Sequence, residues 1–183
     1  MKRFLFLGIG LVLALSCKSQ DKFDYYLWPY NEKTNKVEFA ESVRAQGIVG
    51  DSLFSYARQF LTTTFNTSTD TLISEDTSTN VVVCKSSIHL PVKELGERGK
   101  GYISFKFLIR CRNNNYSYSL TNFEHLASTP DGIAGGPLEL EMPVVGGRTF
   151  PKRYWNDYKA RCYFAIQNTL EQLKDAMTHK AQG

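Results

Sequence analysis

Two glutamates in a glycine- and proline-rich stretch have the spacing that most resembles a catalytic pair. Glu139 and Glu141 alternate with the apolar residues Leu138, Leu140 and Met142. A strand here would place both carboxylates on one side, as the acid and base of many hydrolases are placed. The same alternation is typical of the solvated face of an edge strand. A carboxylate-dependent hydrolase of the periplasm or cell surface is therefore the alternative function, and not the preferred one.

The other residues that could carry chemistry form no motif. His89, His125 and His179 lack metal-ligand spacing to one another or to a cysteine, so we expect no metal and no cofactor. The glycine-rich residues 131–136 lack the Lys-Ser/Thr pair of a phosphate-binding P-loop, and no serine lies in a nucleophile-elbow motif. With no catalytic residue to assign, the sequence favours a protein that is not an enzyme.

The N-terminus has the layout of a secretory signal. Residues 1–16 read MKRFLFLGIGLVLALS, with Lys2 and Arg3 before an apolar run that is too short to span a bilayer comfortably. The run ends in ALSC, which resembles a lipobox, in which the thiol of Cys17 is diacylated before cleavage. The alternative is an ordinary secretory signal with Cys17 incidental. Either interpretation predicts that the protein leaves the cytoplasm, and the first predicts a location in the cell envelope with a lipid anchor on the periplasmic or outer-surface side of the outer membrane.

Composition predicts one globular domain and disfavours nucleic-acid binding. The chain has 183 residues, of which 42% are hydrophobic and 13% aromatic. Removing residues 1–16 takes two of the 22 basic residues and none of the 18 acidic ones, which leaves a formal charge of +2. No basic run follows except Lys152 and Arg153. The electrostatic pattern of a nucleic-acid-binding protein is therefore missing.

Three cysteines remain in the exported chain, so at most one disulfide can form within it. Cys84 and Cys111 would lie close together if their strands formed a hairpin turning near Gly96, and an oxidising envelope would allow a bridge. The alternative, which we favour, is free thiols, because cysteine is a common buried strand residue.

The periodicity predicts a sheet built against an early helix. Residues 50–65 repeat apolar side chains at helical spacing, with Asp51 placed to cap the first turn. Stretches with strand-like alternation surround this helix, with a tight hairpin expected at Asn113–Asn115; they cover 37–45, 71–76, 80–90, 102–112 and 116–123. These elements predict an α+β domain with a meandering antiparallel sheet of about five strands and two helices on one face.

The C-terminal part is predicted as a long connection followed by the second helix. Residues 129–151 are rich in glycine and proline and could include a short strand at 138–142. From about Tyr154, apolar residues recur at steps of three and four over about 25 residues. We therefore divide the chain into a signal peptide (1–16), a lipid attachment and tether (17–35), a sheet domain (36–126), and the loop with a helix that packs on the same domain (127–183).

The segments GDSLFSYARQFL, ISEDTSTNVVVCKS and GYISFKFLIRCRNNNYSYSLTNFEHL resemble the domain-of-unknown-function family numbered 4468, found in envelope proteins of Bacteroides-type bacteria. The resemblance runs from about Val37 to Leu126 and includes Leu53-Phe54 at the helix start and Phe60 later in it. It implies a fold like that of the TATA-binding protein, a curved antiparallel sheet with helices on one face. These are core and turn positions, so the resemblance implies no mechanism.

The preferred function is a non-enzymatic binding or accessory module for an envelope protein or glycan, anchored to the membrane by lipid. Tyr102, Tyr116 and Tyr118 are the candidate partner-binding surface, because tyrosine combines contact area with a polar group. We expect the site on the sheet face away from the helices or along residues 129–151, since the helices must use their apolar faces in the core. The alternative is that other segments cover these aromatic rings.

Overall fold

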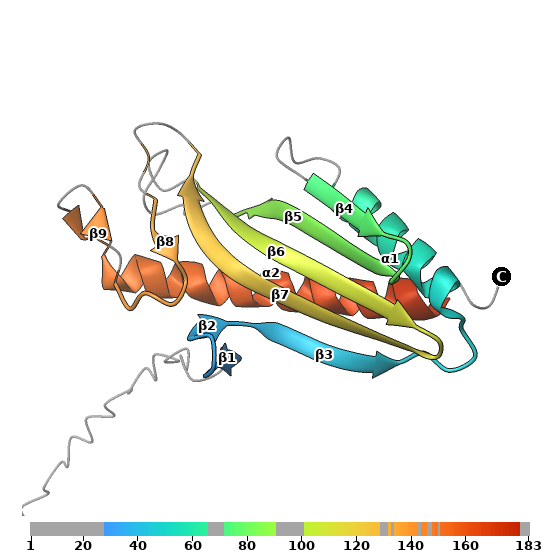
Figure 1. The fold of residues 1–183 in the computed structure, drawn as a ribbon. Coiled ribbons are helices and arrows are strands. Elements are labelled where there is room, and N and C mark those ends of the chain that lie inside the picture. The colour runs from blue at the N-terminus through green and yellow to red at the C-terminus, as the bar shows by residue number, and fades with distance from the viewer. Residues whose placement is uncertain are drawn as a thin grey trace, which may run out of the picture.

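The computed structural model describes residues 28–65, 72–90, 101–128, 134–142 and 151–179, together with 132, 144–145 and 148–149. Its main sheet has six antiparallel strands in the order β3-β7-β6-β5-β4, with β8 paired to β7 (Figure 1). The bounds of these strands are β3 Phe39–Arg44, β4 Leu72–Asp76, β5 Val81–His89, β6 Gly101–Arg112, β7 Asn115–Ala127 and β8 Gly136–Pro137. Short two-stranded ribbons pair β1 Tyr30–Asn31 with β2 Lys36–Val37 and β9 Val144–Val145 with β10 Arg148–Thr149.

Two helices cover one face of this sheet. α1 (Gly50–Phe65) and the long α2 (Lys152–His179) both run behind the strands in Figure 1. The buried residues of β6 alternate along its length, and the fully buried Phe107 and Ile109 face the helices. Leu53 of α1 and Ile166 of α2 are fully buried in the same core. This alternation is what a sheet with one covered face requires, because successive side chains of a strand point to opposite faces.

The β6–β7 hairpin turn holds the start of α1. Asn113 Oδ1 accepts a hydrogen bond from the backbone N–H of Gly50 at 2.8 Å, so a distant side chain satisfies a free donor at the helix N-terminus. Asn114 has φ of 62°, a conformation that asparagine tolerates better than most residues. The tight hairpin predicted at Asn113–Asn115 is confirmed. The Asp51 carboxylate accepts a hydrogen bond from the side-chain amide of Asn80, in the β4–β5 turn, at 3.0 Å.

A β-bulge divides β7 into two halves with opposite alternation. Ser104 of β6 pairs with Glu124, and Lys106 pairs with Thr121. An advance of two residues along β6 therefore corresponds to three residues along β7. Asn122 lies inside this bulge with φ of 57°. The buried residues of β7 therefore change from even positions to odd ones; they are Tyr116, Tyr118 and Leu120 before the bulge, and Phe123 and His125 after it.

The sequence-based fold is confirmed with three differences. The main sheet has six strands rather than five, because Gly136–Pro137 adds a short strand beside β7. Residues 138–142, proposed as a strand, form no strand. Trp28, placed in the predicted tether, packs against Phe39 and Tyr163, with ring centroids 5.7 and 5.6 Å away. The signal peptide, residues 1–16, and Cys17 lie outside the described residues.

Cysteine pairing across β5 and β6 is excluded by the register of the two strands. Cys84 lies opposite Phe107, and Cys111 lies opposite Tyr116 on the other neighbour. Both thiols and that of Cys162 are free and buried. The free-thiol alternative is therefore confirmed. Within the described ranges, no helix is both long and apolar enough to cross a membrane.

Adjacent residues of β6 allow the two faces of the sheet to be compared by mutation. Phe107→Ala removes a fully buried ring and should lower the free energy of unfolding by about 3–5 kcal/mol. Leu108→Ala truncates the next side chain, which points to the other face and is partly exposed, and should cost about 1 kcal/mol or less. Urea denaturation of both variants measures the difference. Equal losses would contradict the assignment of the faces.

Candidate functional site

The second face of the sheet is covered by no described element, and we call it the open face. Strand register arranges its side chains in rows that cross β5, β6 and β7. The row nearest the end of β5 is aromatic and apolar, with His89, Tyr102 and Leu126 side by side. Tyr102 and Leu126 are 37% and 40% exposed, and the His89 and Tyr102 rings are 5.1 Å apart. The next rows toward the middle are polar and then basic.

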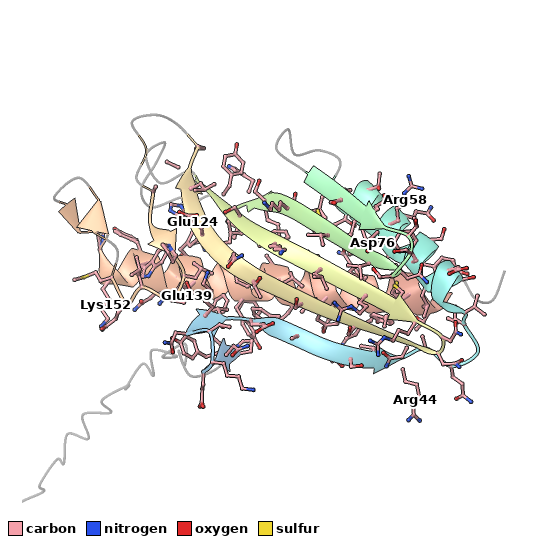
Figure 2. All side chains as sticks on the ribbon, in the orientation of Figure 1. Arg44, Arg58, Asp76, Glu124, Glu139 and Lys152 are labelled. Carbon is pink, nitrogen blue, oxygen red and sulfur yellow. The ribbon has the colours of Figure 1, made fainter. Side chains whose placement is uncertain are left out.

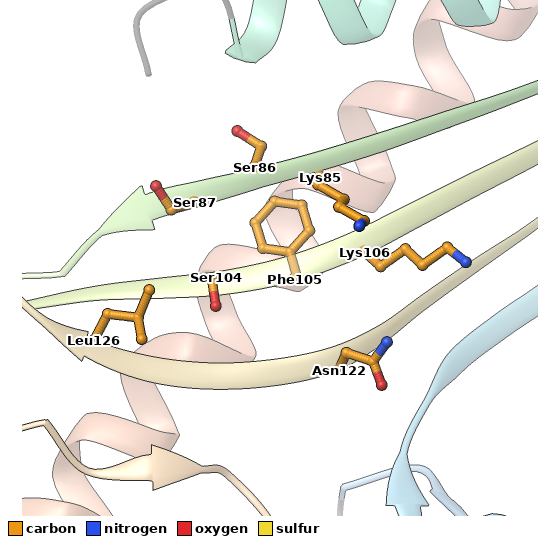
Figure 3. Close-up of a pocket in the computed structure, with 8 residues that line it drawn as sticks. All are labelled: Lys85, Ser86, Ser87, Ser104, Phe105, Lys106, Asn122 and Leu126. Atoms are coloured by element: carbon orange, nitrogen blue, oxygen red, sulfur yellow. The ribbon is translucent and has the colours of Figure 1, made fainter. Parts of the chain in front are cut away.

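A cavity of about 240 Å³ lies on the open face at the level of the bulge (Figure 3). Lys85 and Lys106 line it from neighbouring strands, and the register places these two residues directly opposite each other. Serine hydroxyls from the adjoining row also line the cavity, as do Asn122 and Leu126, with Phe105 beneath. No carboxylate is among the lining residues.

The bulge brings Asn122 to the cavity and fixes its orientation. Lys36 Nζ donates to Asn122 Oδ1 at 2.7 Å, so the amide oxygen is already engaged. Figure 3 shows the amide nitrogen directed toward Lys106 and the oxygen turned away. Since an amide nitrogen only donates, Asn122 offers a donor to the cavity. The side chains lining this site thus supply two ammonium groups, an amide N–H donor and three serine hydroxyls. Of these hydroxyls, that of Ser104 donates to the backbone carbonyl of Glu124 at 3.3 Å.

Lys85 and Lys106 form a like-charged pair across β5 and β6. Like charges directly opposite on neighbouring strands destabilise a sheet. None of the ion pairs formed within the described part of the chain uses Lys85 or Lys106. Glu124, in the adjoining row opposite Ser104, is the carboxylate of β7 closest to the cavity in register. The cavity is therefore a site of concentrated positive charge that would favour an anion.

The tyrosines predicted as a partner-binding surface divide between the two faces. Tyr116 and Tyr118 are only 0% and 5% exposed and face the helices, so their assignment to a partner surface is wrong. Tyr118 donates its hydroxyl to Glu41 Oε2 at 2.7 Å, and the same carboxylate pairs with Lys174 of α2 at 2.7 Å. These contacts, the Lys174 bond first, hold the pKa of Glu41 below its usual value. Tyr102 is on the open face, and its role in binding stays a prediction.

The predicted pair of glutamates does not form a catalytic arrangement. Glu139 accepts the backbone N–H of Val37 at 2.9 Å, which ties the connection before α2 to β2. Glu141 pairs with Lys152 at 2.5 Å and its side chain is 83% exposed. Figure 2 shows Lys152 at the start of α2 and Glu139 closer to β2. Because residues 138–142 are not a strand, the alternation that suggested two carboxylates on one side has no structural basis.

No motif or spacing in the sequence pointed to Lys85, Lys106 or Asn122. The two lysines are 21 positions apart in the chain, and only the register of β5 against β6 brings them together. The available signal was that each lysine occupies a polar position of an alternating strand. Among the described residues, no group of three or more His, Cys, Asp or Glu side chains could hold a metal ion.

An antiparallel sheet with two helices on one face and an open second face defines the class of α+β domains with a TBP-like fold. Residues 39–125 match the family model described as "Domain of unknown function (DUF4468) with TBP-like fold". The resemblance seen in the sequence is therefore confirmed.

Two crystal structures share the fold. A TBP-like protein from Parabacteroides distasonis superposes with a TM-score of 0.60 at 15% identity, over 78% of this chain and 92% of that one. A DUF4468 family protein from Bacteroides ovatus gives 0.59 at 9% identity, over 80% and 89%. None of the curated proteins matches the sequence. At these identities the likeness shows the fold alone.

Below the open face, the end of β7 buries a histidine. His125 is fully buried, and its Nδ1 accepts the backbone N–H of Gly135 at 2.7 Å. Its ring lies 4.5 Å from that of Tyr158 on α2 and 6.1 Å from that of Trp155. Burial lowers the pKa of His125 to about 4, so the imidazole stays neutral at physiological pH. This histidine connects β7, the strand β8 region and α2, and has a structural role.

The shifted pKa predicts that stability depends on pH. His125 titrates near 6.5 in the unfolded chain and near 4 in the folded one, so its contribution is complete above pH 6.5 and lost as pH falls to 4. The difference of about 2.5 between these two pKa values corresponds to about 3 kcal/mol of stability. Urea unfolding at several pH values should show this loss. His125→Asn, which keeps an acceptor for Gly135, should remove that part of the slope, whereas the exposed control His89→Asn should keep it. An unchanged slope in His125→Asn would refute the assignment.

Proposed function

We propose that this protein is an exported, lipid-anchored binding module of the cell envelope, with no catalytic activity, that binds a protein or glycan through the open face. The observation that carries the proposal is the open face itself, where a basic cavity adjoins an exposed aromatic and apolar row. A stable sheet needs one face covered, and α1 with α2 covers that face. The second face is then available for binding.

The composition of the open face supports a binding role. Tyr102 and Leu126 offer apolar contact area next to a basic centre, a combination that suits a partner with both apolar and anionic groups. Of the three tyrosines predicted to form a partner-binding surface, Tyr102 remains a candidate contact. The connection 129–151 stays a second candidate surface, and eight of its 23 residues lie outside the described ranges.

The two alternative functions gain no support. A hydrolase would need a pair of carboxylates in one cavity, yet Glu139 and Glu141 are held by Val37 and Lys152. None of the three described cavities is lined by a carboxylate. Nucleic-acid binding by analogy with the TATA-binding protein remains disfavoured, because the export signal and the formal charge of +2 after residue 16 both argue against it.

A photo-crosslinking amino acid placed in the living bacterium would test the open face. Placed at Leu108 or Tyr102, it should give covalent adducts, detected as a mass shift of the chain. The same amino acid at Phe164 is the matched control, because that side chain is 64% exposed but belongs to α2, on the other side of the sheet. Adducts from Phe164 alone, with none from the open face, would contradict the proposal.

Metabolic labelling would test the lipid anchor. Cells grown with a palmitate analogue should label the protein, and Cys17→Ala should remove both the label and the membrane association, because Cys17 is the only cysteine next to the signal. Cys84→Ala is the control. The Cys84 thiol is buried in the folded domain, so this substitution should leave labelling unchanged. A wild-type chain without label would exclude lipidation and leave plain secretion.

A further inference from the structure

We propose that the cavity between Lys85 and Lys106 binds a phosphate monoester group of the ligand. This inference rests on the proposed function and specifies the chemistry of its site. The two lysines and the amide N–H of Asn122 offer only donors to the cavity, and no lining residue carries negative charge. An anion is thus the ligand class that the cavity fits.

Charge matching favours a dianion over a single carboxylate. Two ammonium groups lie on facing positions of β5 and β6, and a phosphate monoester carries between −1.5 and −2 charges near neutral pH. Its three terminal oxygens accept hydrogen bonds, which matches the two lysines together with the amide of Asn122. A bound dianion would also offset the repulsion between the two lysines.

The backbone at the site supports a ligand role. Asn122 has φ of 57°, in the left-handed region, and residues in such conformations are concentrated at ligand sites. The bulge that contains Asn122 turns this side chain onto the open face, and Lys36 fixes the amide orientation.

The cavity size indicates that the phosphate is part of a larger molecule. A volume of about 240 Å³ is below the roughly 300–1,000 Å³ of pockets that enclose a whole small ligand. Leu126 lines the cavity on the side away from the lysine tips and is 40% exposed, so the group that carries the phosphate would continue across an apolar surface. Both a phosphorylated sugar and a phosphorylated lipid headgroup have this chemistry.

The test is a titration of the purified protein with defined probes at low ionic strength. Glucose 1-phosphate and vesicles containing phosphatidic acid are the two monoester sources, while glucose and dimethyl phosphate are the neutral and monoanionic controls. Backbone amide chemical shifts should change around residues 104–106 and 122 for the soluble ester, and vesicle co-sedimentation measures the lipid. We expect at least one monoester to bind at least tenfold more tightly than dimethyl phosphate, and glucose not to bind.

Variants make the result specific to the lysine pair. Lys106→Met and Lys85→Met should each weaken monoester binding at least tenfold, and both should raise the urea concentration at the unfolding midpoint because the repulsion is gone. Lys33→Met removes a charge from the exposed β1–β2 turn and should change neither quantity. Weaker binding in a variant that is more stable cannot be a folding defect.

Two results would overturn the inference. One is that neither monoester binds more tightly than dimethyl phosphate. The other is that Lys85→Met and Lys106→Met bind as the wild type does. If either result occurred while crosslinks from Leu108 persisted in cells, the open face would remain the binding surface and only the phosphate chemistry would be excluded.

Discussion

The burial of one sheet face against α1 and α2 is the constraint on which the rest of the structure depends. Strand β6 contributes a continuous line of buried side chains to this core, and a shift of one residue would turn all of them toward solvent. The register of β5 and β7 against β6 is therefore fixed by the apolar side. The positions of the polar side chains on the open face, including Lys85 opposite Lys106, follow from the same register.

The elements of this fold were predictable because their signals are local. The helix at 50–65 and the alternation along β6 depend on side chains within a few residues of one another, and the structure has both where the sequence placed them. The faces of the β7 tyrosines were not predictable from simple alternation. A local signal existed, since the buried positions change from Leu120 to Phe123 by a step of three, and Asn122 between them tolerates positive φ.

The candidate site was not predictable because it is built from register rather than from sequence spacing. Lys85 and Lys106 meet across a strand pair whose connection spans the residues between His89 and Gly101. The same register explains why Cys84 meets Phe107 and cannot reach Cys111. Sequence spacing instead suggested Glu139 and Glu141 as a pair on one side of a strand. Residues 138–142 do not form a strand, so their alternation does not place the two carboxylates together.

The two faces of the sheet have different roles, which explains how destabilising features can persist on the open face. The helix side supplies the stability, so the open face can keep a left-handed asparagine and two facing lysines, each of which costs free energy on its own. These costs do not fall at separate places. They coincide at one bulge, around one cavity, and all of them orient hydrogen-bond donors or positive charge toward the same volume. Local departures from good packing that converge in this way are expected at functional sites, where a ligand offsets the cost when it binds.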